Sequence, residues 1–231
     1  MSSPSDVAPA TANPWTRPVR GARGPVPNHS RAGIAAAGVE LADAQGLDNV
    51  TMRAIARSLG MGAPSLYRYV KSREEIVELM ADLAIGAPPE GLPSGDWTES
   101  ILRLANTQLL RHQEHGWLVR AALGSTNLGP NTLDWFEAYL LAMAKLEMPA
   151  RTKMEVIALV TGLVSLFAQQ HQRAEASPPG FDLLSPENHP HLAAALTAPE
   201  GAPEARGLFD RAVLALCAGL GGNSPLPGQA H

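Results

Sequence analysis

The sequence predicts an all-α protein, and three observations indicate this fold class. Aromatic residues make up only 5% of the 231 residues whereas Ala is frequent, so the core must come mainly from aliphatic side chains on helices. Apolar residues recur with helical spacing over most of the chain. No alternation of Val, Ile and Thr is long enough for a sheet, and the sequence shows no internal repeat.

The composition and the two ends of the chain narrow the class further. Residues 1–27 contain six prolines and almost no apolar periodicity, which predicts a disordered arm, and residues 221–231 are expected to form a flexible tail. A single cysteine, Cys217, excludes folds held by disulfides or thiolate clusters. The longest nearly uncharged apolar run, 156–168, is too short to cross a bilayer. With no secretory signal either, the chain is expected in the cytoplasm without a membrane partner.

Four helices are expected within residues 28–85, and the first two have clear boundaries. The first begins after Ser30 and stops at Gly46, a residue type that suits the left-handed conformation at helix ends. Thr51 is a favourable N-cap for a second, short helix that Gly60 ends.

The third and fourth helices of this unit follow directly. A short helix over 63–70 carries Pro64 in its first turn, where the missing N–H costs nothing. Ser72 followed by Glu75 forms a capping box, and this pair opens a linking helix over 72–85.

A loop rich in Pro and Gly separates this unit from a second helical unit over 96–220. Its helices are expected at about 96–114, 116–123, 130–147, 150–176, 188–197 and 203–220. Charge also divides the chain, because residues 1–75 carry a net charge of +3 and residues 76–231 one of −7. This asymmetry indicates that only the first part meets a polyanion.

Residues 51–73 have the organisation of a helix-turn-helix. A capped helix and a glycine-bounded turn precede a short helix whose outward positions are small, hydroxylated, aromatic or basic. Small residues at its start allow its N-terminus to enter the major groove of DNA. Arg68 suits a bidentate contact with guanine, and the alternative is a solvated surface arginine.

Over residues 30–85 the sequence resembles the tetracycline-repressor (TetR) family of bacterial transcription regulators. The matching elements are Thr51, Ile55-Ala56, Leu59-Gly60-Met61, Leu66-Tyr67-Arg68-Tyr69-Val70 and Lys71-Ser72-Arg73-Glu74-Glu75. The resemblance implies an N-terminal three-helix helix-turn-helix DNA-binding domain followed by a larger helical ligand-binding and dimerisation domain. It also implies a repressor that binds a palindromic double-stranded DNA operator as a homodimer and is released by a small, largely apolar molecule.

The family pattern, carried over position by position, implies two sets of DNA-contacting residues. The residues expected to face bases are Arg53, Ala63, Pro64, Tyr67 and Arg68. Those expected to hold phosphates are Thr51, Ser65, Tyr67, Tyr69 and Arg73. Tyr67 and Tyr69 point to different faces of a helix, so Tyr69 is expected to be at least partly packed. Ile55, Leu59, Leu66 and Val70 are assigned to the core.

The arm offers a separate DNA-binding hypothesis. Arg17, Arg20 and Arg23 are spaced by three in a proline-bearing segment just ahead of the first helix, and such a segment can lie in a minor groove. An ordinary solvated tail is the alternative.

The second unit is expected to supply the dimer interface and the effector pocket. The helices at 150–176 and 203–220 are apolar over more than one face and contain small residues, so two from each subunit would form a four-helix interface; the alternative is that both are core. Aromatic, Met and polar side chains suit a pocket for an apolar ligand, although each could instead be core or surface. The candidates are Asn106, Gln108, His112, Trp117, Trp135, Phe136, Tyr139, Met143, Phe167 and Gln170.

Other functions find less support. His112 and His115 have spacing for a metal but lack a suitable carboxylate, so we interpret them as surface histidines and expect no metal and no cofactor. The family's histidine and threonine contacts for magnesium-chelated tetracycline find no match. Catalytic motifs are absent, which argues against an enzyme. The alternative function is a dimeric DNA-binding regulator, an activator included, that has no small-molecule ligand.

Overall fold

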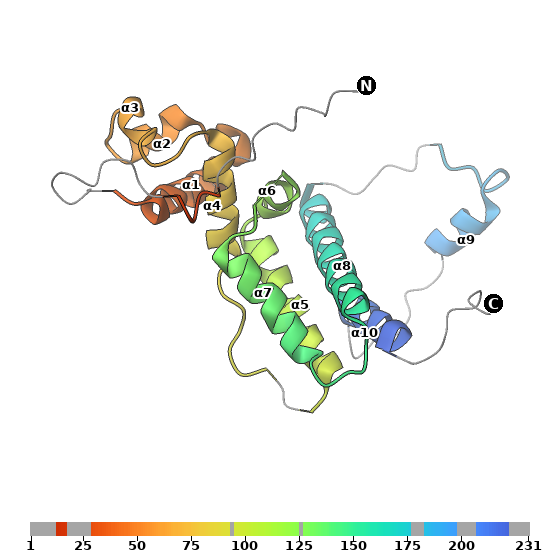
Figure 1. Ribbon diagram of the computed structural model, residues 1–231. Coiled ribbons are helices and arrows are strands. Elements are labelled where there is room, and N and C mark those ends of the chain that lie inside the picture. The colour runs from red at the N-terminus through yellow and green to blue at the C-terminus, as the bar shows by residue number, and fades with distance from the viewer. Residues whose placement is uncertain are drawn as a thin grey trace, which may run out of the picture.

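The computed structural model describes residues 13–17, 29–92, 95–124, 127–176, 183–197 and 207–221, and within these ranges it contains helices and no strand. Figure 1 shows two groups of helices joined by α4. The first group is α1 (Arg31–Gln45), the 3-10 helix η1 (Leu47–Asn49), α2 (Met52–Ser58), α3 (Ala63–Leu66) and α4 (Arg73–Ile85). The second is α5 (Trp97–Glu114), α6 (Leu118–Gly124), α7 (Pro130–Ala142), α8 (Ala150–Ala176), α9 (Pro190–Thr197) and α10 (Leu208–Gly221).

The helices of the first group begin at capping residues that the sequence predicts. The Ser30 hydroxyl accepts a hydrogen bond from the Gly33 N–H at 3.0 Å, and the Thr51 hydroxyl accepts one from the Ala54 N–H at 3.1 Å. These bonds satisfy N–H groups that have no partner within their own helix. The sequence therefore determines where α1 and α2 start.

The third helix is shorter than the 63–70 expected from the sequence. After α3 ends at Leu66 the chain tightens, with the Tyr69 N–H bonded to the Leu66 carbonyl three residues back at 2.9 Å. This turn places Val70 in the core beside Leu66, and both side chains are fully buried. The next helix, α4, can then start at the Ser72 cap.

Helices α1 and α4 cross closely at Gly38. A Cβ atom on Gly38 would lie 2.5 Å from the Met80 sulfur, so a glycine is needed for this approach. The Met80 side chain is fully buried and belongs to one hydrophobic cluster that extends from Ile34 in α1 to Val213 in α10. The two groups of helices therefore share a continuous core through α4.

The second group packs around α5 and α8. Helix α10 contacts both of them, and α4 contacts α6 and α7. Helix α7 ends at Ala142 rather than near residue 147, because the Met143 N–H turns back to the carbonyls of Leu140 and Tyr139. Helix α9 has no buried residue and stands apart from the other helices in Figure 1.

Helix α8 differs from the sequence expectation in one respect. The stretch Ala150–Gln172 is long and apolar enough to cross a membrane by length and composition, because it contains an 18-residue window with a mean hydropathy of 1.3, of which 28% is buried. The expectation counted only the apolar run, whereas uncharged residues continue from Ala168 to Gln172. One such helix is weak evidence for a span, since core helices of soluble proteins pass the same test.

Candidate DNA interface and effector pocket

Several residues that the sequence assigned to DNA contacts lie at the surface of α2 and α3. The side chains of Thr51, Arg53, Pro64 and Arg68 are exposed, and Tyr67 is 55% exposed. Ala63 and Ser65 are half-buried. An exposed arginine and tyrosine that follow small residues at a helix start fit the geometry for reading a major groove.

Two other predicted DNA contacts have structural partners within the protein. Tyr69 is only 8% exposed, as the expected partial packing requires, and its carbonyl accepts a hydrogen bond from Arg31 Nε at 2.9 Å. Arg73 donates from Nε to the Val50 carbonyl at 2.6 Å and from Nη2 to the Leu47 carbonyl at 2.8 Å. Arg73 therefore holds the segment between α1 and α2 against α4.

Arg17, one of the three arm arginines predicted to lie in a minor groove, has partners within the protein in this structure. Its guanidinium pairs with the Glu75 carboxylate in α4 and donates to the Tyr69 carbonyl at 3.3 Å, so it points into the protein in this structure. Arg20 and Arg23 lie outside the described residues, as do most of the predicted arm and nearly all of the predicted tail.

A cavity of about 470 Å³ lies between the second group of helices and α4. Five of the predicted pocket residues line it: Gln108, His112, Trp135, Phe136 and Tyr139. Its other lining residues are largely apolar and come from α4, α6, α8, the segment just before α7 and Trp15. The size and lining suit a small apolar molecule with a few polar groups.

Two polar side chains of the pocket, Tyr139 and His112, form hydrogen bonds to Gln108. The Tyr139 hydroxyl donates to Gln108 Oε1 at 2.8 Å, and His112 Nδ1 donates to the Gln108 carbonyl at 2.8 Å. Burial lowers the pKa of His112 and raises that of Tyr139 above the ordinary value. Both groups are therefore neutral near pH 7, and the neutral His112 ring keeps an acceptor at Nε2.

The interpretation of both histidines as surface residues was wrong for His112. It faces the interior of the fold and is buried, because its position on α5 turns towards the cavity. His115 instead bonds to the Asp43 carboxylate at 2.9 Å. Among the described residues, no group of three His, Cys, Asp or Glu side chains could hold a metal ion.

The other five predicted pocket residues are not among those that line the cavity. Trp117 donates its indole N–H to Asp43 at 2.7 Å, and Asn106 donates to Asp210 at 3.0 Å. Phe167 packs edge-on against Phe209, Met143 is fully buried in the core, and Gln170 is exposed on α8. These side chains are of the types that suit a ligand pocket, but the packing of the helices places them in the core, in contacts with other residues or at the surface.

Sequence reasoning missed the acidic residues of α4 that line the cavity. The Asp82 carboxylate accepts hydrogen bonds from the Thr132 N–H at 2.9 Å and the Thr132 hydroxyl at 3.0 Å, and so caps the start of α7. The Glu78 carboxylate accepts from Asn127 at 2.9 Å. Helix α4 thus joins the α2 and α3 surface to the cavity wall. The two acids were four residues apart on a helix predicted only as a linker.

Comparison with known proteins agrees with this division. The family described as bacterial regulatory proteins, tetR family, matches residues 34–80, and the family described as tetracyclin repressor-like, C-terminal domain, matches residues 88–221. The chain belongs to the TetR family. Its members are transcription regulators and not enzymes. We call the exposed surface of α2 and α3, where the predicted base contacts lie, the DNA-reading surface.

Individual relatives of this TetR-family chain include regulators of Streptomyces and Saccharopolyspora species. It is 30% identical over 181 residues to the HTH-type transcriptional repressor DrrR1 of Streptomyces coeruleorubidus. These aligned residues make up 74% of this chain and 67% of that protein. It is 29% identical to an HTH-type transcriptional regulator of Saccharopolyspora erythraea, with 97% of each chain covered. The crystal structure of Streptomyces coelicolor ActR in complex with (S)-DNPA has a TM-score of 0.68 at 23% identity, covering 83% of this chain and 96% of that one. At this identity the structure shows the shared fold.

Proposed function

We propose that this TetR-family chain is a ligand-responsive repressor, which binds a palindromic DNA operator as a homodimer and is released by a small, largely apolar molecule. A repressor among the relatives, DrrR1, and solved complexes of ActR with (S)-DNPA and with actinorhodin support this direction. The observation that carries the proposal is the cavity itself, because α4 forms one of its walls.

Helix α4 gives a ligand a physical route to the DNA-reading surface. Ala81, Asp82 and Ile85 contribute to the cavity wall, and Met80 of the same helix packs against α1 at Gly38. A ligand that binds more tightly when α4 has moved shifts the protein towards that arrangement, whereas equal affinity for both arrangements shifts nothing. The movement alters the spacing of the two reading heads in a dimer and so weakens binding to a palindrome.

The surface of α8 and α10 supports the proposed dimer. Leu159 and Leu166 of α8 are each 50% exposed and lie on one helical stripe. On α10, Leu208 is exposed, and the exposed small residues Ala215 and Gly219 permit close approach of a second chain. Burial of such apolar surface between subunits stabilises association.

DNA binding is tested with a fluorescent duplex that covers the protein's own upstream region. We expect tight, salt-dependent binding by the wild type, and a loss of preference over random DNA of about tenfold or more in Arg68→Ala. The matched control is Arg151→Ala, which removes an exposed arginine of α8 that forms an ion pair with Glu155 in the same helix. Equal preference in Arg68→Ala and wild type would contradict the proposed reading head.

The ligand response is tested on the same duplex with a panel of apolar compounds. A compound that raises the melting temperature of the protein and also releases the DNA supports the proposal, since it binds the folded chain and shifts its conformation. Stable DNA binding with no stabilising compound would favour the regulator without a small-molecule ligand.

Dimerisation is tested by sedimentation of a Leu159→Glu/Leu166→Glu variant. We expect this variant to be monomeric, because two carboxylates would have to be buried in the interface. Leu141→Glu is the control, since Leu141 is 65% exposed and lies on α7 rather than on α8 or α10. A variant that remains dimeric would exclude this stripe as the interface.

A further inference from the structure

A short segment ahead of α1, Asn13–Arg17, lies against α4 and reaches the effector pocket; we call it the N-terminal clasp. Trp15 of the clasp is half-buried and lines the cavity together with Asp82 and Gly129. A Cβ atom on Gly129 would lie 2.6 Å from Trp15 Cζ2, so the indole packs directly on the start of α7. The Trp15 indole therefore forms part of the pocket wall, although it belongs to neither group of helices.

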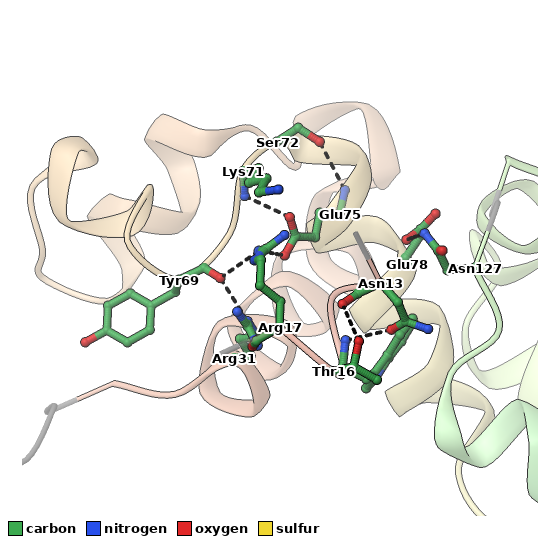
Figure 2. A network of polar contacts seen from close by, with 11 residues as sticks. Asn13, Thr16, Arg17, Arg31, Tyr69, Lys71, Ser72, Glu75, Glu78 and Asn127 are labelled. Atoms are coloured by element: carbon green, nitrogen blue, oxygen red, sulfur yellow. Dashed lines mark hydrogen bonds and ion pairs between the residues drawn. The ribbon is translucent and has the colours of Figure 1, made fainter. Parts of the chain in front are cut away.

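The other end of the clasp contacts the DNA-binding unit. Arg17 pairs with the Glu75 carboxylate and donates to the Tyr69 carbonyl at 3.3 Å, while Arg31 Nη1 donates to the Arg17 carbonyl at 2.5 Å (Figure 2). The second oxygen of Glu75 accepts from the Lys71 N–H at 2.9 Å. Arg17 thus connects Tyr69, in the turn after α3, to the first turn of α4.

A local turn holds these two contacts in a fixed relation. The Asn13 side chain accepts from the Trp15 N–H at 2.9 Å, and the Asn13 carbonyl accepts from the Arg17 N–H at 3.3 Å. Trp15 and Arg17 are two residues apart within this turn. The turn therefore provides a path of two residues from the indole in the cavity wall to the Arg17 guanidinium.

We propose that the N-terminal clasp is a ligand-sensing element, in which Trp15 contacts the apolar effector and Arg17 couples that contact to Tyr69 and Glu75 beside the DNA-reading surface. The proposal rests on the proposed function, because it requires an effector in the pocket. It makes Trp15 a specificity-determining residue and gives the effector a second route to the reading head besides α4.

The test of contact uses the uncharged apolar fluorophore N-phenyl-1-naphthylamine, since Glu78 and Asp82 on the pocket wall disfavour an anionic probe. We expect Trp15→Ala to weaken saturable binding of the probe by about tenfold, as loss of one aromatic wall predicts. Trp97→Ala, a matched truncation of a half-buried Trp that does not line the cavity, should leave the affinity unchanged. Equal affinities in both variants overturn the proposal.

The test of coupling follows hydrogen exchange of the Lys71 amide, which Glu75 protects. We expect the probe to change this exchange rate in the wild type and not in Arg17→Gln. Trp15→Ala and Arg17→Gln should each speed the exchange. The double variant should exchange no faster than Arg17→Gln alone, because both substitutions act through the same contact of Arg17 with Glu75. Additive effects, or no response in the wild type, overturn the proposal.

The two proposals fail in different ways. A wild type that shows neither saturable probe binding nor operator binding contradicts the proposed function and, with it, the proposed sensing role of the clasp. A wild type that binds both the probe and the operator, with Trp15→Ala behaving like Trp97→Ala, leaves the proposed function intact and overturns the clasp alone.

Discussion

The Asp82 carboxylate in α4 receives both the backbone N–H and the hydroxyl of Thr132 in the first turn of α7. An N-cap normally comes from the residue just before its helix, whereas this one comes from a residue 50 positions away in sequence. The start of α7 is thereby fixed to the helix that carries the DNA-reading unit. The position of α4 and the shape of the pocket depend on the same carboxylate.

Asp82→Ala is expected to lower the free energy of unfolding by about 1–2 kcal/mol, because the cap of α7 is lost. The control is Asp96→Ala, which removes a local cap of α5 that binds the Thr98 N–H at 2.8 Å. Only the Asp82 variant should also change operator affinity. Urea unfolding and DNA titration measure the two effects, and identical DNA binding by the Asp82 variant and wild type would contradict a coupling role.

Gly129→Ala is expected to disturb the same contact by steric overlap. The new methyl group would lie 2.2 Å from Asp82 Cγ, a separation that requires the carboxylate or the loop before α7 to shift. Overpacking of this kind costs about 1–3 kcal/mol. Gly124→Ala is the matched control, since its Cβ would meet nothing within 4 Å. Thermal unfolding should separate the two variants, and equal melting temperatures would rule out the overlap.

Arg73→Gln is expected to destabilise the fold by about 1–3 kcal/mol, because the carbonyls of Leu47 and Val50 lose their charged donor. Arg68→Ala should change stability by less than about 0.5 kcal/mol, since the side chain is exposed. Chemical unfolding of both variants checks the contrast between a structural and a DNA-reading arginine. An Arg73 variant as stable as wild type would show that these two bonds contribute nothing.

Protonation of His112 is expected to make the fold less stable in mild acid. Burial lowers its pKa in the folded chain below the ordinary 6.5, so the unfolded chain binds the proton more readily. The contribution of His112 to stability is complete above pH 6.5 and declines as the pH falls from there through the lowered pKa. Melting temperatures measured between pH 8 and 5 should fall less in His112→Gln than in wild type. His191→Gln, at an exposed site on α9, should follow the wild type.

Local patterns predicted the features that depend on near neighbours in sequence. Ser30, Thr51 and Ser72 cap helices because each side chain reaches an N–H three residues ahead. Gly46 ends α1 with a positive φ of 84°, a backbone conformation that favours glycine whatever its distant neighbours are. Together with the helical spacing of apolar residues, these signals specify the all-α fold.

Long-range packing decided what the sequence could not show. Arg17 and Arg73 have the residue type of DNA contacts, yet carbonyl and carboxylate partners far along the chain hold them inside the structure. Trp117 suited an apolar pocket, but Asp43 in α1 binds its indole N–H. Conversely, the sequence indicates no role for Asp82, because its partner Thr132 lies 50 residues away.

The continuous core through α4 has a consequence for the construction of hybrid regulators. A fusion that exchanges DNA-reading heads at residue 85 would retain Met80 beside Gly38 but would remove the partners that Asp82 and the apolar residues Ala81 and Ile85 have beyond it. A graft that preserves both specificity and inducibility has to carry the recipient's own matching residues on the far side of α4. The loop after α4 separates the two units in sequence, but the DNA-binding unit cannot be exchanged there without loss of the contacts between α4 and the second group of helices.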